Sequence, residues 1–182
     1  MDATTAVYFR RQDYAGFWLR LLIDLVDSVV AGIACILVLL ALLGVAGGRT
    51  ILLIWAAIAF CYFVLLERSK LGTAGYLVAG VKIVGPDGQR ASFFSLTLRF
   101  SFMVLGPLNG LLDLVWLSGD AHRQALRDKF AQTYVVKKNA EPAGSGKLLP
   151  RHYEICGMNF LFREIEPVPG ILPKSLATDE HR

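Results

Sequence analysis

Ser28-Val-Val-Ala-Gly-Ile-Ala-Cys-Ile-Leu-Val-Leu-Leu-Ala-Leu-Leu-Gly-Val-Ala46 is a run of nineteen residues without a charge. As a helix it would rise about 28 Å, close to the thickness of the hydrocarbon core of a membrane. A second uncharged run, Ile51 to Leu66, follows a tight turn predicted at Gly47-Gly-Arg-Thr50. Together the two runs predict an antiparallel pair of full transmembrane helices, over about residues 16–46 and 51–67.

The composition is that of a membrane protein. Of 182 residues, 54% are hydrophobic and 19% are charged, which is too apolar for an ordinary soluble domain of this size. The net charge of +4 is modest and the cations are spread over loops and tail, so nucleic acid is not an expected partner. The cysteines lack metal-site or disulfide spacing, and we expect no metal and no cofactor. The predicted partner is the lipid bilayer.

The distribution of basic residues predicts how the chain is oriented in the membrane. One end of the helix pair is flanked by seven cations, whereas the turn at the other end carries only Arg49; the seven are Arg10, Arg11, Arg20, Arg68, Lys70, Lys82 and Arg90. Because cytoplasmic loops are enriched in Lys and Arg, residues 1–13 and the chain after residue 67 are expected in the cytoplasm. We therefore expect a multi-pass inner-membrane protein with both termini cytoplasmic.

Two short stretches look like β-strands, at about residues 80–84 and 132–138. A two-stranded fragment is marginal alone, so we expect both strands to share a small cytoplasmic sheet packed beneath the helices. The remaining chain, residues 139–182, is predicted to be a cytoplasmic tail. Its first part, Glu141-Pro-Ala-Gly-Ser-Gly146, has the composition of a flexible linker.

Residues 92–118 form a third apolar stretch, interrupted by Gly106-Pro-Leu-Asn-Gly110. Proline and two glycines are credible helix breakers at that place. We predict two short helices, at about 92–105 and 109–118, folded into a re-entrant or steeply tilted hairpin, with a single kinked span as the alternative. The predicted membrane domain thus covers residues 14–138, and the fold class is an α-helical integral membrane protein with a small β element.

A charged face opens the first long helix, Arg20-Leu-Leu-Ile-Asp24-Leu-Val-Asp27. Offsets of four and seven residues place Arg20, Asp24 and Asp27 within about 60° of one another on one face. A charge facing lipid costs about 2.5–3.5 kcal/mol, so these groups must pair, face protein or water, or lie at the membrane edge. Depth counted back from the outer turn places them at the cytoplasmic boundary.

The order of several motifs resembles the RDD family of small bacterial membrane proteins. They are Ala15-Gly-Phe-Trp-Leu-Arg-Leu-Leu-Ile-Asp-Leu-Val-Asp27, Gly72-Thr-Ala-Gly75, Gly80-Val-Lys-Ile-Val-Gly-Pro-Asp-Gly88, Arg99 and Arg127-Asp-Lys-Phe-Ala-Gln-Thr-Tyr-Val-Val136. The family is named for one arginine and two aspartates, which the resemblance assigns to Arg20, Asp27 and Asp128. The resemblance implies transport, including cation/proton exchange for some members. Three positions depart from the family pattern: Ala74 stands where proline is common, Tyr76 where lysine is common, and Arg127 where histidine is common.

Two interpretations of the charged face stay open. In the first, Arg20 and the acids of its helix neutralise one another, and Asp128 pins the cytoplasmic sheet to the helices as a structural clasp. In the second, Asp24, Asp27 and Asp128 form an acidic pocket that takes up a cation or proton. Arg99 and Asp113 are further candidates, with Arg99 either reaching toward the headgroups or pairing with a buried acid such as Asp113.

The functional prediction is transport of ions or small solutes through this acidic cluster, and the alternative is a non-transporting scaffold that docks a partner through its cytoplasmic sheet and tail. Two spans and a hairpin are too few to enclose a path, so transport would require a homo-oligomer. No nucleophile motif or phosphate-binding loop occurs, so we expect no enzyme and predict no catalytic residue.

Overall fold

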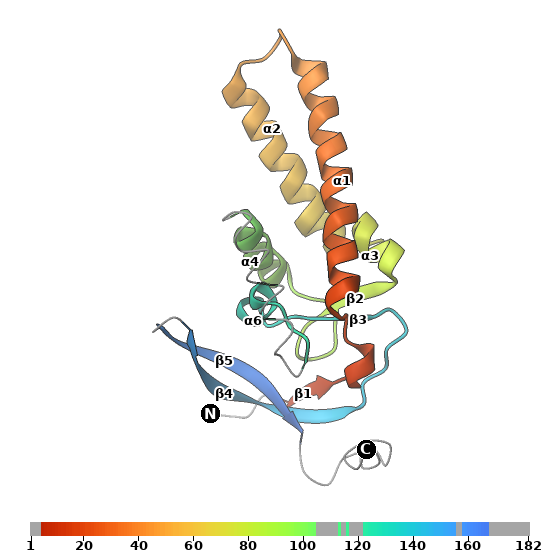
Figure 1. The fold of residues 1–182 in the computed structure, drawn as a ribbon, viewed down its shortest axis with the longest axis vertical. Coiled ribbons are helices and arrows are strands. Elements are labelled where there is room, and N and C mark those ends of the chain that lie inside the picture. Colours follow the sequence, from red (N-terminus) through yellow and green to blue (C-terminus); the bar gives the residue numbers. More distant parts are fainter. Residues whose placement is uncertain (1–4, 105–112, 114–115, 117–121, 156–157, 168–182) are drawn as a thin grey trace.

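The computed structural model describes residues 5–104, 113, 116, 122–155 and 158–167. Two long helices rise from a body of shorter helices and strands (Figure 1). They are α1, Phe17–Leu42, and α2, Gly48–Phe60, which continues into a single π-helical stretch, η2, Cys61–Leu66. Both Phe17–Leu42 and Gly48–Leu66 are long and apolar enough to cross a membrane, which confirms the predicted helix pair.

The long helices keep most of their apolar side chains on the outside. Leu40 and Leu52 are 64% and 63% exposed, although a soluble protein would bury such residues. Where the helices meet, the indole Nε1 of Trp55 donates a hydrogen bond to the carbonyl of Cys35 at 3.1 Å. This outward apolar surface matches the hydrocarbon of a bilayer.

The turn between the long helices lies earlier than predicted. α1 ends at Leu42, and Gly44 adopts a φ of +80°, a conformation that favours glycine. α2 then begins at Gly48, with Gly47 as its N-cap, so Arg49 belongs to its first turn. The predicted turn over 47–50 is therefore wrong, because glycine is also tolerated where a helix starts.

The two predicted short strands pair with each other. β2, Val81–Val84, and β3, Tyr134–Lys137, are antiparallel, with Val84 opposite Tyr134. Because successive side chains of a strand point to opposite faces, Ile83 and Val135 join a core beneath the long helices, whereas Val84, Tyr134 and Val136 join a second core on the other face. The ribbon is thus the middle layer of the molecule.

A short helix that the sequence did not indicate lies between the second long helix and β2. α3, Ala74–Ala79, starts after Thr73 and ends at Gly80, whose φ is +64°. Six residues are fewer than two turns, too few for a helical apolar period to show in the sequence. α3 packs beside the lower part of α1 (Figure 1).

The tail and the amino-terminal segment form one sheet. β4, Gly144–Ile155, pairs with β1, Thr5–Tyr8, and with β5, Met158–Pro167, in the order β1-β4-β5. A flexible linker over Glu141–Gly146 is therefore wrong from Gly144 onward. A Cβ on Gly146 would lie 2.5 Å from the carbonyl oxygen of Glu166, so this glycine permits close approach of two strands.

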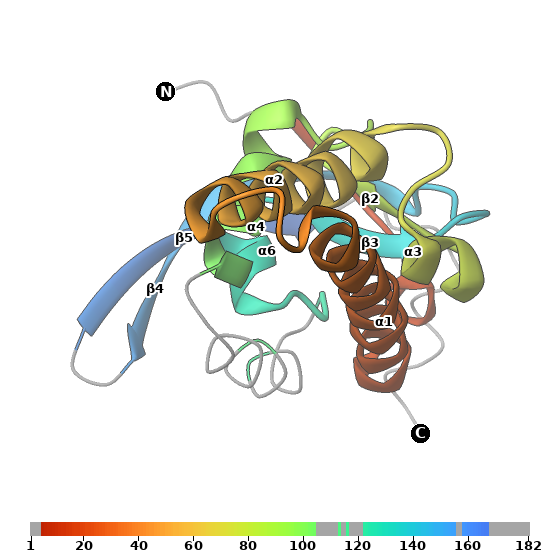
Figure 2. The same cartoon turned by 90° about the horizontal axis from the view of Figure 1, so that it is seen from above.

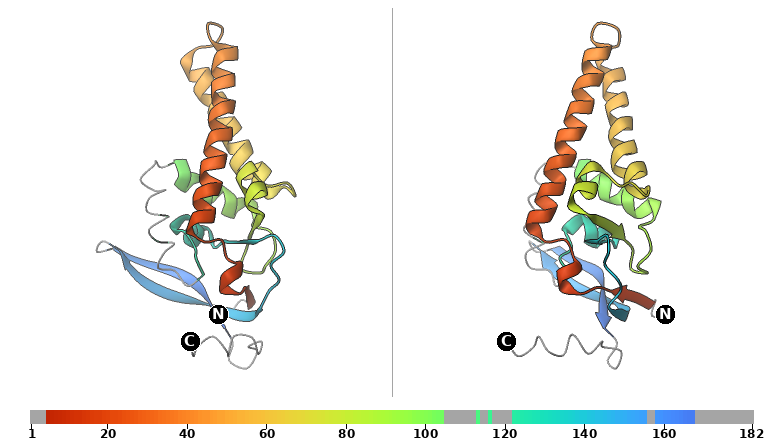
Figure 3. Two further views of the ribbon diagram at one scale, coloured as in Figure 1. Left: turned by 45° about the vertical axis from the view of Figure 1, so that its right-hand side comes forward. Right: turned by 90° about the vertical axis from the view of Figure 1, so that its right-hand side faces the viewer.

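The remaining helices connect these layers. α4, Phe93–Val104, confirms the predicted helix over 92–105, and α6, Leu126–Ala131, precedes β3. The predicted second helix, 109–118, lies outside the described residues except for Asp113 and Trp116, as does the choice between hairpin and single span. Seen along the long helices, the β4–β5 hairpin projects to one side (Figure 2), and both side views keep the strands at one end of the helix pair (Figure 3).

Candidate functional site

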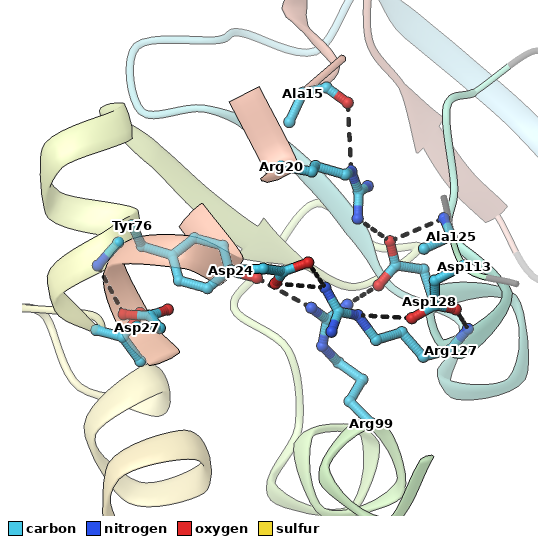
Figure 4. Close-up of polar contacts among 12 residues, drawn as sticks. Ala15, Arg20, Asp24, Asp27, Tyr76, Arg99, Asp113, Ala125, Arg127 and Asp128 are labelled. Atoms are coloured by element: carbon cyan, nitrogen blue, oxygen red, sulfur yellow. Dashed lines mark hydrogen bonds and ion pairs between the residues drawn. The ribbon is translucent and has the colours of Figure 1, made fainter. Parts of the chain in front are cut away.

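Asp128 is the centre of a buried ionic network at the base of the long helices (Figure 4). It lies in α6 and is fully buried. Its Oδ2 is 2.5 Å from Nη1 of Arg20 in α1, and its Oδ1 contacts Nη1 of Arg99 in α4. The backbone N–H of Ala125 also donates to Oδ2 at 3.2 Å. One carboxylate therefore joins three elements that are far apart in the sequence.

Besides Asp128, Arg20 binds two backbone carbonyl oxygens. Arg20 donates through Nη2 to the carbonyl of Arg123 at 2.9 Å and through Nε to that of Ala15 at 3.3 Å. Because these partners come from outside its own helical face, the predicted pairing of Arg20 with Asp24 and Asp27 is wrong. An ion pair between them is not found among the described residues.

Arg99 is buried, so the prediction that it reaches toward lipid headgroups is wrong. Besides Asp128, it donates to the hydroxyl oxygens of Thr133 and Tyr76, both at 3.0 Å. Burial raises the pKa of the Tyr76 hydroxyl, with nearby Arg99 opposing the shift, so this group stays neutral and can accept the hydrogen bond. Arg99 does pair with a buried acid, but the acid is Asp128, not Asp113.

Asp27 lies in a separate polar site that holds the start of α3. Its carboxylate accepts three hydrogen bonds of 2.7 Å, from the hydroxyls of Tyr62 and Thr73 and from the backbone N–H of Gly75. Tyr62 belongs to the π-helical stretch η2. A carboxylate at a helix start accepts from otherwise unpaired N–H groups, so Asp27 fastens α3 to both long helices.

Asp24 and Asp113 meet on Arg127, the residue before Asp128. Nη2 of Arg127 lies 3.0 Å from Oδ1 of Asp24, and its Nε lies 3.2 Å from Oδ2 of Asp113. The backbone N–H of Arg127 also donates to Asp113 at 2.9 Å. Burial lowers the pKa of the Arg127 guanidinium, but the two carboxylates outweigh it and the pKa lies above its ordinary value. Arg127 is therefore a cation at every physiological pH.

A small cavity lies among the side chains of the Asp27 site and the Arg127 site. Its volume of about 30 Å³ leaves room for one or two water molecules. Asp24, Asp27 and Glu67 line it together with Arg99 and Arg127, whereas Asp128 does not. Burial raises the pKa of the Glu67 carboxyl, with Arg99 at 3.9 Å opposing the shift. The single pocket predicted for Asp24, Asp27 and Asp128 is thus wrong for Asp128.

The family comparison follows the same segments. A model of the RDD family matches residues 14–132, about two thirds of the chain.

The chain belongs to the RDD family.

Among curated proteins, an uncharacterized protein of Bacillus subtilis (strain 168), YckC, is 24% identical over 128 residues, covering 67% of this chain and 83% of that protein. No solved structure gives a significant match. The expected membership is confirmed, and with it the coarser prediction of a membrane protein with two apolar helices.

In this RDD protein the arginine and the second aspartate of the signature pair directly, whereas Asp27 serves another site. The sequence did not indicate three residues that the network uses, Glu67, Tyr76 and Arg127. Tyr76 and Arg127 stand where other residues are common in the family, which was the available signal. For Glu67 the available signal was weaker: it is the first charged residue after the second apolar run.

Proposed function

We propose that this RDD protein is a membrane-bound scaffold whose charged residues act as a structural clasp. The proposal rests on one observation: Asp24, Asp27 and Asp128 are each bound by hydrogen-bond donors of the protein itself. Asp128 contacts two arginines, Asp27 accepts three hydrogen bonds, and Asp24 pairs with Arg127. Groups engaged in this way fix elements in place, and we do not propose an enzymatic activity for them.

The part offered to a partner is the β1-β4-β5 sheet. Two neighbours of Asp128 in α6 hold it: Lys129 pairs with Glu164 of β5, and the ring of Phe130 lies 5.0 Å from that of Phe162. β5 is one of the two edge strands of this sheet in the described part of the chain, and Leu161 on it is 59% exposed. Edge strands pair readily with an extended segment of another protein, which is the partner we propose.

We place the sheet in the cytoplasm. The body below the long helices carries Arg10, Arg11, Arg68 and Lys70, and the other end of the helix pair carries Arg49, in the first turn of α2. This asymmetry supports an inner-membrane protein with the amino terminus and the described tail on the cytoplasmic side.

A photo-crosslinker at Leu161 tests the scaffold function in cells that produce the full chain. We expect one reproducible protein adduct at Leu161 and none at the matched lipid-facing position Leu53, which is 63% exposed. The Leu161 adduct should persist in an Asp24→Asn variant, because Asp24 pairs with Arg127, whereas Lys129 and Phe130 make the contacts from α6 to the sheet. Equal labelling at both positions would contradict a docking role.

The small cavity favours a second candidate, uptake of a proton or cation. Glu67 combines a raised pKa with a place in a polar cavity beside Asp24 and Asp27, a combination typical of groups that exchange protons. Transport would need a homo-oligomer, because two spans do not enclose a path. Proton flux into proteoliposomes that is lost in Glu67→Gln, but kept in the surface control Asp87→Asn at equal protein levels, would favour transport over the scaffold.

A further inference from the structure

A cavity of about 270 Å³ opens where the second apolar span ends. One wall is Glu67 to Gly72, which directly follows Leu66, the last residue of that span. Val81 and Ile83 of β2 also line the cavity. The cavity is distinct from the small one beside Asp27, although Glu67 and Tyr76 contribute to both. It therefore lies at the level where the chain leaves the membrane.

The lining of this cavity is strongly basic. It contains five cations and one acid; the cations are Arg68, Lys70, Lys82, Arg90 and Lys138. The acid, Glu67, has only 8% of its side chain exposed and lies 3.9 Å from Arg99, so it contributes little negative charge to the cavity. Lys82 and Arg90 donate to backbone carbonyls, and the described residues hold no ion pair to any of the five. The uncompensated positive charge would attract an anion.

Exposed apolar side chains border the same cavity. Leu71 and Leu77 line it and are 66% and 52% exposed, and neighbouring Val78 is 66% exposed. A soluble anion such as a sugar phosphate would gain nothing from these residues. An anionic phospholipid would, because its phosphate meets the cations while its glycerol and acyl chains lie against the apolar rim.

We propose that this cavity binds the phosphate-bearing headgroup of an anionic membrane phospholipid. Lys70 and Lys138 supply charge from two different elements, since Lys70 follows the second span and Lys138 follows β3. Its volume suits a glycerol phosphate, being below the range of about 300–1,000 Å³ found for drug-sized ligands. A bound headgroup would join the end of the second span to the β2–β3 ribbon. The lipid-binding proposal does not depend on the scaffold function or on transport.

Native mass spectrometry of the full-length protein tests the proposal. The delipidated protein is offered phosphatidylglycerol and phosphatidylcholine in equal amounts in mixed micelles. We expect selective retention of phosphatidylglycerol and a loss of affinity on the order of fivefold for each removed lysine, so about 25-fold in Lys70→Gln/Lys138→Gln. The matched control, Lys137→Gln/Lys147→Gln, removes the same charge from exposed residues outside the cavity and should bind within about twofold of wild type.

Three outcomes would overturn the proposal. Equal retention of both lipids by the wild-type protein is one, and it decides the matter even if the double variant does not fold. An equal loss of phosphatidylglycerol in the test and control variants is another, because it would reflect net charge alone. The third is binding of glycerol 3-phosphate by the wild-type protein in lipid-free micelles with the same affinity as phosphatidylglycerol. That result would identify the ligand as a soluble anion.

Discussion

Asp128 shares its carboxylate between Arg20 and Arg99, so an Asp128→Asn change would leave two buried guanidinium groups without their countercharge. Breaking a buried pair in this way costs about 3–5 kcal/mol, since the remaining charge stays out of water. We expect Asp128→Asn to lower the thermal stability of the detergent-solubilised protein and its level in membranes. Thermal unfolding and quantitative blotting measure the two effects.

Asp24→Asn is the matched control for this change. It removes the same charge from the same network, but the Asp24 side chain is 41% exposed, so the expected cost is at most about 1 kcal/mol. Equal destabilisation by the two substitutions would show that Asp128 is not the structural centre that its burial indicates.

Gly75 tests how closely α3 approaches α1. A Cβ at this position would lie 2.5 Å from the carbonyl oxygen of Ile23 and 2.9 Å from the carboxylate of Asp27. Gly75→Ala should therefore separate the helices and cost about 1–3 kcal/mol, read as a lower unfolding temperature. Gly32→Ala in α1 is the control, because open space surrounds Gly32 and alanine favours the helix there.

Among the residues of the site, Arg20, Asp27 and Asp128 were predictable from the sequence, but their partners were not. Helical spacing predicts which side chains share a face, and it correctly put Asp24 and Asp27 beside one cavity. It does not predict which residues of other elements reach that face. Arg20 turns toward the start of its own helix, as long helical side chains do, and there meets Asp128, 108 residues away.

Among the elements, α6 connects the membrane helices to the sheet with four consecutive residues. Arg127 and Asp128 contact α1, whereas Lys129 and Phe130 contact the β4–β5 hairpin. The hairpin side of this connection depends on the ionised carboxylate of Glu164, which Lys129 and the hydroxyl of Tyr153 contact.

Acid should loosen the hairpin through Glu164. Burial raises the pKa of its carboxyl, but hydrogen bonds from Lys129 and Tyr153 outweigh burial and hold the pKa below its ordinary value. A pKa that is lower in the folded state stabilises the protein above the unfolded pKa, and this contribution disappears as the pH falls through the folded pKa. Hydrogen exchange in β4 and β5, corrected for intrinsic rates, should therefore accelerate below about pH 4.5.

Glu164→Gln should accelerate that exchange already at neutral pH and weaken its response to acid. Glu166→Gln is the control, because Glu166 lies on the same strand but is exposed. An unchanged exchange rate in Glu164→Gln would contradict the role of Lys129 and Glu164 in holding the hairpin.

Elements with an uninterrupted apolar run or a clear strand composition were predictable, whereas elements that depend on distant neighbours were not. The two long helices and α4 carry uninterrupted apolar runs, and β2 and β3 have a clear strand composition. The tail hairpin was missed because Gly144 and Gly146 suggest flexibility when they are read locally. Glycine is needed there because residues far along the chain approach closely. A Cβ on Gly144 would lie 2.5 Å from the hydroxyl of Tyr8.

For the molecule as a whole, the charge asymmetry predicts a definite sidedness. In a cysteine-free background, Arg49→Cys should react with a membrane-impermeant thiol reagent in intact cells. Asn139→Cys, exposed after β3, should react only after the cells are permeabilised. The reverse pattern would place the sheet outside and contradict a cytoplasmic partner. The two apolar helices and the family could be predicted from the sequence, because hydropathy and motif order extend over most of the chain.

The separation of 108 residues between Arg20 and Asp128 also sets an order of events during synthesis. At about 5–20 residues per second, the ribosome completes Asp128 roughly 5–22 seconds after Arg20. If the first span enters the membrane within this interval, its arginine still lacks the carboxylate of Asp128 and depends on water or headgroups. A chain released before Asp128 would keep that arginine unpaired, so a prematurely ended product should be a ready substrate for membrane proteases.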